Sequence, residues 1–178
     1  SVSAAAGEVA AQAWGAGSGW ALEKVPDLVG ERDDPTGFEP LHAPVGEAWR
    51  VFPGWRVPRS GLVLQALVPS VIEQKVTGQE AFSGYRRLVT RFGEPAPGPG
   101  SDLGLRVPPT AAGWAGIPSW EWLAAGVDPA RSRTVVRLVR HAGRIEECAD
   151  LPVEAARARL QALPGVGGFG NLASFSPN

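Results

Sequence analysis

The fold is decided by the stretch Leu62-Val63-Leu64-Gln65-Ala66-Leu67-Val68-Pro69-Ser70-Val71-Ile72. This stretch is apolar on almost every side of a helix, a pattern typical of a helix at the centre of a bundle. Pro69 lies inside it, so we expect a kink there. Ser60, just before the stretch, is the expected N-terminal cap. We therefore predict that Leu62–Ile72 is the most buried helix of the protein.

Amphipathic helices are predicted on the C-terminal side of this stretch. Thr77 and Glu80 have the spacing of a capping box, and the helix that they begin carries a 3.6-residue apolar stripe as far as Phe92. A second long helix begins at Asp128, an N-cap followed by Pro129 at the first helical position, and its apolar stripe continues as far as Ile145. Shorter helices are expected at Pro109–Gly116, at Ser119–Gly126 and from Pro152 onward.

The first 40 residues are predicted to form a small irregular α+β unit. Glu8–Trp14 is expected to be a strand without an evident partner, and Ser18–Leu28 a short helix capped by Ser18. Another short helix, Pro44–Phe52, follows. Because no alternating strand of useful length occurs after residue 14, the fold class is mainly α: a helical bundle over residues 41–178, preceded by a remnant of an N-terminal domain at residues 1–40.

The composition fits one domain and excludes several classes of protein. Of the 178 residues 44% are hydrophobic, which is enough to bury a core. The single cysteine, Cys148, excludes an intrachain disulfide framework, and no apolar run approaches the roughly 18 residues of a membrane span. The formal net charge of −1 gives no global basic field. The absence of methionine, even at position 1, indicates a fragment or a processed product.

The charge is nevertheless uneven along the chain. Four arginines recur on one face of the helix that starts at Asp128, namely Arg133, Arg137, Arg140 and Arg144. No acidic residue interrupts the chain from Pro129 to Arg144, so the local field is positive and suits a phosphate backbone. A solvated helix face is the simpler interpretation of the same pattern.

The segment Leu163-Pro164-Gly165-Val166-Gly167 is expected to form a tight hairpin. The two glycines allow positive φ while Val166 stays anchored in the core. Such a turn presents backbone amides at the start of the following helix, where phosphate binds readily. An ordinary helix–helix turn is the alternative interpretation.

Two further patterns have two interpretations each. Trp120 and Trp122 either line a pocket for a flat, electron-poor ring or pack in the core. The polar run Glu73–Gly78, which follows the buried helix directly, is either an exposed loop at the mouth of the core or a plain helix connection.

Four segments, taken in order, resemble the helix-hairpin-helix DNA glycosylases of the 3-methyladenine type, in a form found in actinobacteria. They are Val71–Gly78, Arg91–Pro95, Ile117–Trp122 and Leu163–Gly167. The resemblance runs through nearly the whole chain up to Gly167. The hairpin alone is shared with many DNA repair proteins, whereas the four segments in this order are much more specific for this family.

The resemblance implies a DNA N-glycosylase of base excision repair, which flips an alkylated base out of duplex DNA and hydrolyses its N-glycosidic bond. It also implies a cytoplasmic, nucleoid-associated monomer that requires no cofactor. A structural Na⁺ or K⁺ is expected at the hairpin, bound by the backbone carbonyls of Gln161, Leu163 and Val166.

The resemblance also assigns roles to three groups of residues. The residues that hold a backbone phosphate are Gly165, Val166 and Gly167. Gln74 and Lys75 lie at the loop that fills the gap left by the flipped base, and Thr77 is also expected to bind DNA. The residues of the base pocket are Phe169, Trp120 and Trp122. Some relatives place an apolar wedge in the gap-filling loop, and Lys75 departs from that pattern.

The family's catalytic aspartate, which stabilises the cationic sugar of the transition state, comes further along the chain than Asn178. The residues after Gly167 are also poor helix formers. The resemblance therefore implies a C-terminally truncated member with little activity of its own, and no catalytic residue is assigned. Two other hypotheses remain: a non-catalytic helix-hairpin-helix module that binds DNA, and a helical protein that binds a small aromatic ligand in a Trp-lined pocket.

Overall fold

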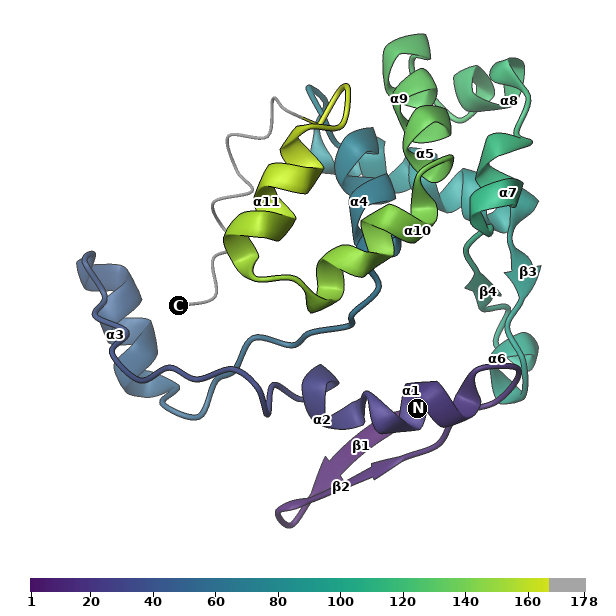
Figure 1. Ribbon diagram of the computed structural model, residues 1–178. Helices are drawn as coiled ribbons and strands as arrows, with labels where there is room; N and C mark the ends of the chain where they lie inside the picture. Colours follow the sequence, from purple (N-terminus) through teal and green to yellow (C-terminus); the bar gives the residue numbers. More distant parts are fainter. Residues whose placement is uncertain (167–178) are drawn as a thin grey trace. The chain divides into compact units, whose positions relative to one another are not determined.

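The computed structural model describes residues 1–166, which divide into two compact units with a boundary after Gly61. Among these residues, helices dominate and strands are confined to two short antiparallel pairs (Figure 1). The prediction of a mainly α fold with a small α+β N-terminal part is confirmed at this level.

The first unit opens with a β-hairpin. Strands β1 (Val2–Ala5) and β2 (Glu8–Ala11) pair antiparallel, with Val2 opposite Ala11. Ala6 and Gly7, between the strands, both have positive φ, of 52° and 82°, as two-residue hairpin turns of type I′ require. The prediction that the strand from Glu8 lacks a partner is therefore wrong. Its partner is the alanine-rich segment before it, in which alternation of apolar and polar residues is hard to see.

Three short helices follow in the first unit: α1 (Ser18–Glu23), α2 (Val25–Leu28) and α3 (Ala43–Val51). The single helix predicted over Ser18–Leu28 is divided, since Lys24 ends α1 and begins α2. Ser18 is not the cap, because Gly17 occupies that position with a φ of 86°.

Hydrogen bonds explain why the first unit extends beyond residue 40. The backbone N–H of Arg59 donates to the Asp27 carbonyl at 2.9 Å, and that of Val57 donates to Asp33 Oδ2 at 2.8 Å. The buried Asp27 carboxylate forms an ion pair with Arg32, with Nε 2.7 Å from Oδ1. These contacts join the segment after α3 to α2 and to the turn that follows α2, and the boundary falls after Gly61 instead of residue 40.

The second unit contains the remaining elements. Its α-helices are α4 (Val63–Ile72), α5 (Gly78–Phe92), α6 (Pro99–Asp102), α7 (Ala111–Ala115), α8 (Ser119–Ala124), α9 (Pro129–Val139), α10 (Ala142–Glu146) and α11 (Val153–Gln161). Strands β3 (Glu94–Pro95) and β4 (Arg106–Val107) form a two-residue pair, and the 3₁₀-helix η1 spans Glu147–Asp150.

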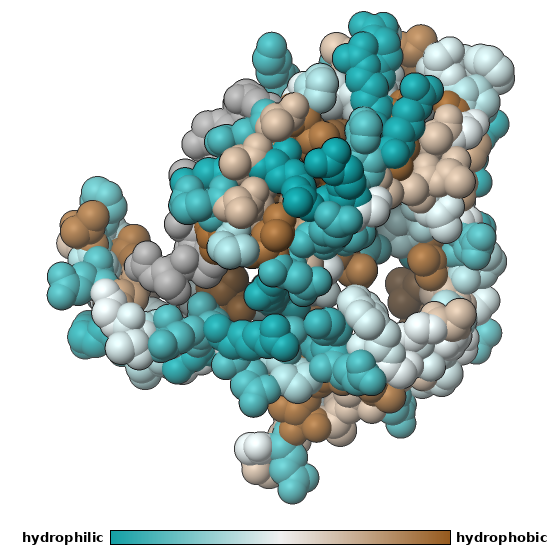
Figure 2. Space-filling model, in the orientation of Figure 1, coloured by the Kyte–Doolittle hydropathy of each residue, from teal (hydrophilic) through white to brown (hydrophobic). Residues whose placement is uncertain are grey.

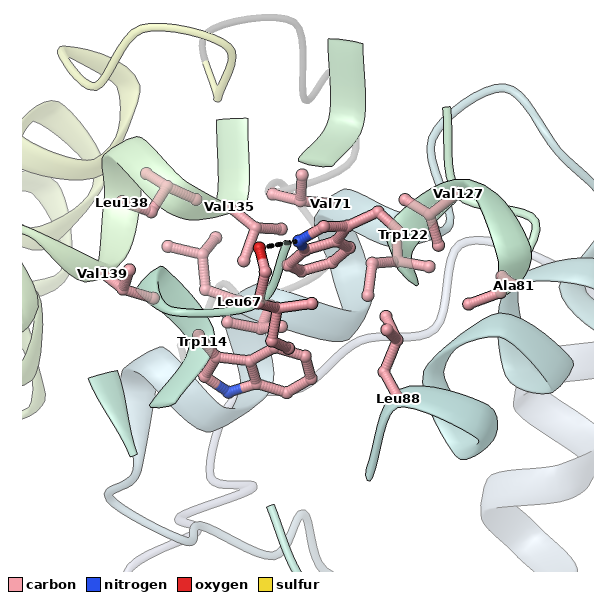
Figure 3. Close-up of a cluster of buried hydrophobic side chains, with 14 of the residues drawn as sticks. Leu67, Val71, Ala81, Leu88, Trp114, Trp122, Val127, Val135, Leu138 and Val139 are labelled. Atoms are coloured by element: carbon pink, nitrogen blue, oxygen red, sulfur yellow. Dashed lines mark hydrogen bonds between the residues drawn. The ribbon is translucent and has the colours of Figure 1, made fainter. Parts of the chain in front are cut away.

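Helix α4 lies in the core of this unit, as predicted. Its buried residues are Leu67, Val68, Val71 and Ile72. Figure 3 shows Leu67 and Val71 among side chains from α7, α8 and α9, including Trp114, Trp122, Val135 and Leu138. One side of α4 is open, since Gln65 and Ala66 are exposed.

The N-terminus of α4 is capped by a distant residue. Glu146, at the end of α10, accepts the N–H of Val63 on Oε2 at 2.8 Å and that of Leu64 on Oε1 at 3.1 Å. The N-cap position itself is Leu62, so the prediction that Ser60 caps this helix is wrong. A glutamate 83 residues away leaves no local pattern from which this cap could be predicted.

In contrast to Ser60, the predicted caps Thr77 and Asp128 are confirmed. Thr77 Oγ1 accepts from the N–H of Glu80, whose carboxylate accepts from the N–H of Thr77 in return. Asp128 Oδ1 accepts from the N–H groups of Ala130 and Arg131. The helix that starts there ends earlier than predicted, because His141 leaves helical geometry with φ −109° and ψ 19°, which separates α9 from α10.

Candidate nucleic-acid interface

The hairpin is described as far as Val166. After α11, the N–H of Val166 donates to the Leu163 carbonyl at 3.0 Å and closes the turn. Val166 is completely buried and Gly165 has a φ of 89°, both as predicted from the sequence. The turn is therefore anchored by one apolar side chain and requires a glycine next to it.

A second constraint at Gly165 comes from helix α9. A Cβ atom at this position would lie 2.7 Å from Thr134 Oγ1 and 2.8 Å from its Cγ2. Thr134 has limited freedom to move away, since its hydroxyl donates to the Ala130 carbonyl at 3.0 Å. The backbone of the hairpin thus packs directly on α9.

The hairpin also contacts the loop that follows α4. Gln74 Nε2 donates to the Gly165 carbonyl at 3.3 Å, which joins two segments 91 residues apart in the sequence. Figure 1 shows the turn after α11 beside the turn after α4. Two of the segments that carry the family resemblance therefore meet in space.

The loop after α4 is held in an unusual backbone conformation. Lys75 is exposed and has a φ of 58°, a left-handed conformation that costs a residue with a side chain about 1–2 kcal/mol. Such strain is found preferentially at functional sites, where the surrounding structure imposes it.

Arg131 is the residue that anchors this loop, and the sequence pattern did not single it out for that role. Its side chain is buried, with Nη1 2.6 Å from the Ile72 carbonyl and Nε 2.8 Å from Asp128 Oδ2. It therefore caps the C-terminus of α4 from α9. The hydrogen bond from the Arg131 backbone N–H is the main cause that lowers the pKa of Asp128, so the carboxylate stays ionised.

The four arginines of the predicted stripe are exposed, and no ion pair joins them to another of residues 1–166. They do not form one helix face, since α9 ends at Val139 and Arg144 lies on α10. Arg133 and Arg137 flank the part of α9 that touches the hairpin, and Figure 2 shows hydrophilic residues over this helix. The acids nearest in sequence to the loop are Glu73, which is exposed, and Glu80, which is engaged in the capping box.

The two tryptophans of the predicted base pocket lie apart. Trp122 is 1% exposed, donates from Nε1 to the Ile117 carbonyl at 3.3 Å and lies beside Trp114, with ring centroids 5.7 Å apart (Figure 3). Trp120 is 67% exposed. Two residues apart on a helix, the rings project in different directions. The alternative interpretation, core packing, is correct for Trp122.

Other predicted site residues are only partly placed. Gly167 and Phe169 lie outside the described residues. Of the carbonyls expected to bind a monovalent cation, that of Leu163 accepts the Val166 N–H. Among residues 1–166, no cluster of histidine, cysteine or acidic side chains has metal-binding geometry, a finding that does not bear on a site made of carbonyls.

The sequence matches no family model, and a comparison with curated proteins finds no match. Within residues 1–166 no helix combines the length and the apolar character needed to cross a membrane.

Proposed function

We propose that the chain is a helix-hairpin-helix DNA-binding protein of the DNA N-glycosylase class, whose substrate is duplex DNA with alkylated bases. The observation that supports the proposal best is the contact of Gln74 with the Gly165 carbonyl. It brings together the hairpin and the loop to which the resemblance assigns phosphate binding and gap filling.

The physical basis of the proposed binding is a rigid turn next to positive charge. Val166 and Thr134 fix the turn from two sides, which keeps the ordering cost of binding low. Lys75, Arg133 and Arg137 are exposed cations on the two segments that the hairpin touches. Each phosphate that such groups neutralise contributes about −0.9 to the slope of log affinity against log salt on duplex DNA.

The test is duplex binding by a Gly165→Val variant, measured at several salt concentrations. We expect weaker binding that is independent of sequence, and a salt slope shallower by about 0.9 for each phosphate that the variant no longer neutralises. Gly143→Val on α10 is the matched control, because a Cβ there meets nothing within 4 Å. Unchanged binding by a folded Gly165→Val variant would remove the hairpin from the proposal.

A second candidate is a non-catalytic DNA-binding module of the same type. The observation that favours it is the position of Trp122, whose burial in the core leaves it unable to face a flipped base. Because no catalytic residue is assigned in the chain, relative affinity for methylated and unmodified duplex DNA distinguishes the two. A protein of the N-glycosylase class should bind the methylated duplex more tightly, whereas a non-catalytic module should bind both duplexes equally and in a salt-dependent way.

A further inference from the structure

Helices α5 and α8 border a shallow cleft of about 370 Å³ that has no part in the hairpin surface. Its polar lining consists of Arg86, Arg87, Thr90 and Arg91 from α5 and Glu121 from α8. Apolar side chains complete it, among them Phe92 and Ala124.

One arginine of the cleft and Glu121, the one acid among the described residues that line it, neutralise each other. Arg91 Nη2 lies 2.5 Å from Glu121 Oε1, and the Glu121 side chain is only 11% exposed. The Arg91 guanidinium also lies over the Phe92 ring, 5.8 Å from its centroid. This ion pair is therefore part of the wall of the cleft and leaves Arg91 little freedom to bind a ligand.

The other two arginines keep their charge available. Arg86 and Arg87 are exposed, and neither side chain has a hydrogen bond or an ion pair with another of the residues that the structure describes. The cleft thus carries two unbalanced positive charges on a fixed frame, which favours an anionic ligand.

An aromatic surface lies on the same helix as the wall of the cleft. Trp120 is 67% exposed, directly precedes Glu121 and is one helical turn before Ala124. A tryptophan exposed to this extent offers a flat face on which a nucleic-acid base can stack.

We propose that this cleft binds one nucleotide unit of single-stranded DNA, with the phosphate between Arg86 and Arg87 and the base on Trp120. The inference rests on the proposed function, since both take a nucleic acid as ligand. Guanidinium groups match the geometry of phosphate oxygens, and the volume suits a single nucleotide better than a folded partner. A single strand is required because the faces of bases in a duplex are covered by their neighbours.

The test is binding of the full chain to a fluorescein-labelled oligothymidylate, followed by fluorescence anisotropy. The variant Arg86→Gln/Arg87→Gln should bind at least about tenfold more weakly and make the salt slope shallower by about 0.7, the contribution of one phosphate on a single strand. Trp120→Ala should bind about tenfold more weakly with no change in slope. The matched control Arg50→Gln/Arg157→Gln removes two exposed or half-exposed charges elsewhere and should bind as the parent does.

Competitors identify the ligand. Thymidine monophosphate should displace the oligothymidylate at lower concentration than inorganic phosphate, because only the nucleotide offers a base to Trp120. Equal competition by the two would overturn the inference, as would displacement by polyglutamate at equal charge concentration. Unchanged affinity of both cleft variants, with their melting temperatures intact, would also overturn it.

The two proposals fail separately. Loss of duplex binding in the Gly165→Val variant, without any effect of the cleft variants on oligothymidylate, rejects the cleft and supports the hairpin. Unchanged duplex binding in the Gly165→Val variant, together with weaker oligothymidylate binding by the cleft variants, supports the cleft. It rejects the hairpin as the site that holds the duplex.

Discussion

At the scale of single residues, Gly165 is the position where backbone conformation and packing coincide. Gly165→Ala should lower the free energy of unfolding by about 2–4 kcal/mol, since it adds left-handed strain and a clash with Thr134. In a Thr134→Ala background the hydroxyl and methyl that cause the clash are gone, so the same substitution should cost less. Urea denaturation of the four proteins of this cycle measures the difference. Equal costs in both backgrounds would show that the clash with Thr134 does not contribute to the destabilisation.

The stability that the Asp128 helix cap contributes should depend on pH. Its pKa is lowered from the ordinary value of 3.8, chiefly by the hydrogen bond from the Arg131 N–H, so the ionised form is favoured in the folded state. A carboxyl group with a lowered pKa contributes stability above its unfolded pKa, and that contribution disappears as the pH falls through the folded pKa. Asp128→Asn keeps a cap but cannot titrate.

We therefore expect the parent protein to be more stable than Asp128→Asn near neutral pH, and the difference to shrink between about pH 5 and about pH 2. Denaturation curves at several pH values measure it. A difference that stays constant over this range would mean that titration of Asp128 does not contribute to stability.

What the sequence could predict at this scale depends on distance along the chain. The caps at Thr77 and Asp128 were predictable because their partners lie within three residues. Positive φ at Gly165 and burial of Val166 were predictable from the alternation of glycine and valine in the hairpin. The role of Arg131 was not, because its main acceptor, the Ile72 carbonyl, is 59 residues away.

At the scale of elements, α4 depends on a carboxylate from α10. Glu146→Ala would leave the N–H groups of Val63 and Leu64 without their acceptor, and the expected loss is about 1–2 kcal/mol of unfolding free energy. Glu147→Ala is the control one residue away. Its carboxylate pairs with Arg159 at 2.6 Å in a largely exposed position, so its removal should cost less than about 1 kcal/mol. A smaller loss for Glu146→Ala than for Glu147→Ala in thermal denaturation would contradict this account of the cap.

The elements also show where periodicity is a good guide and where it is not. The stripe of α5 and the start of α9 followed their apolar patterns, since those helices pack on the core along their length. The end of α9 did not, because the apolar spacing continues through the break at His141 into α10. In the same way, the spacing of Trp120 and Trp122 could not reveal that α8 presents one ring to the core and the other to solvent.

At the scale of the whole molecule, the two units differ in what holds them together. Among residues 1–166, every buried apolar side chain lies at or after Leu67. Within residues 1–61 the buried residues are Asp27 and Gly30, and none of the large apolar side chains is buried; Trp55 and Phe52 are 61% and 64% exposed. Its architecture therefore rests on hydrogen bonds and ion pairs, while the second unit has a continuous apolar core.

This difference predicts how the protein opens. Apolar burial contributes roughly 25 cal/mol per Å², whereas exposed ion pairs contribute little, so most of the folding free energy belongs to the second unit. In native-state hydrogen exchange, the amides of α4 and α9 should be the slowest and should report global unfolding, while those of β2 and α3 exchange through local opening at much lower cost. Substituting Val71→Ala in the core should speed exchange in α4 and α9 and leave α3 unchanged. Protection of α3 equal to that of α4, falling in step with it in the Val71→Ala variant, would instead mean that the two units unfold together and that the apolar core of the second stabilises both.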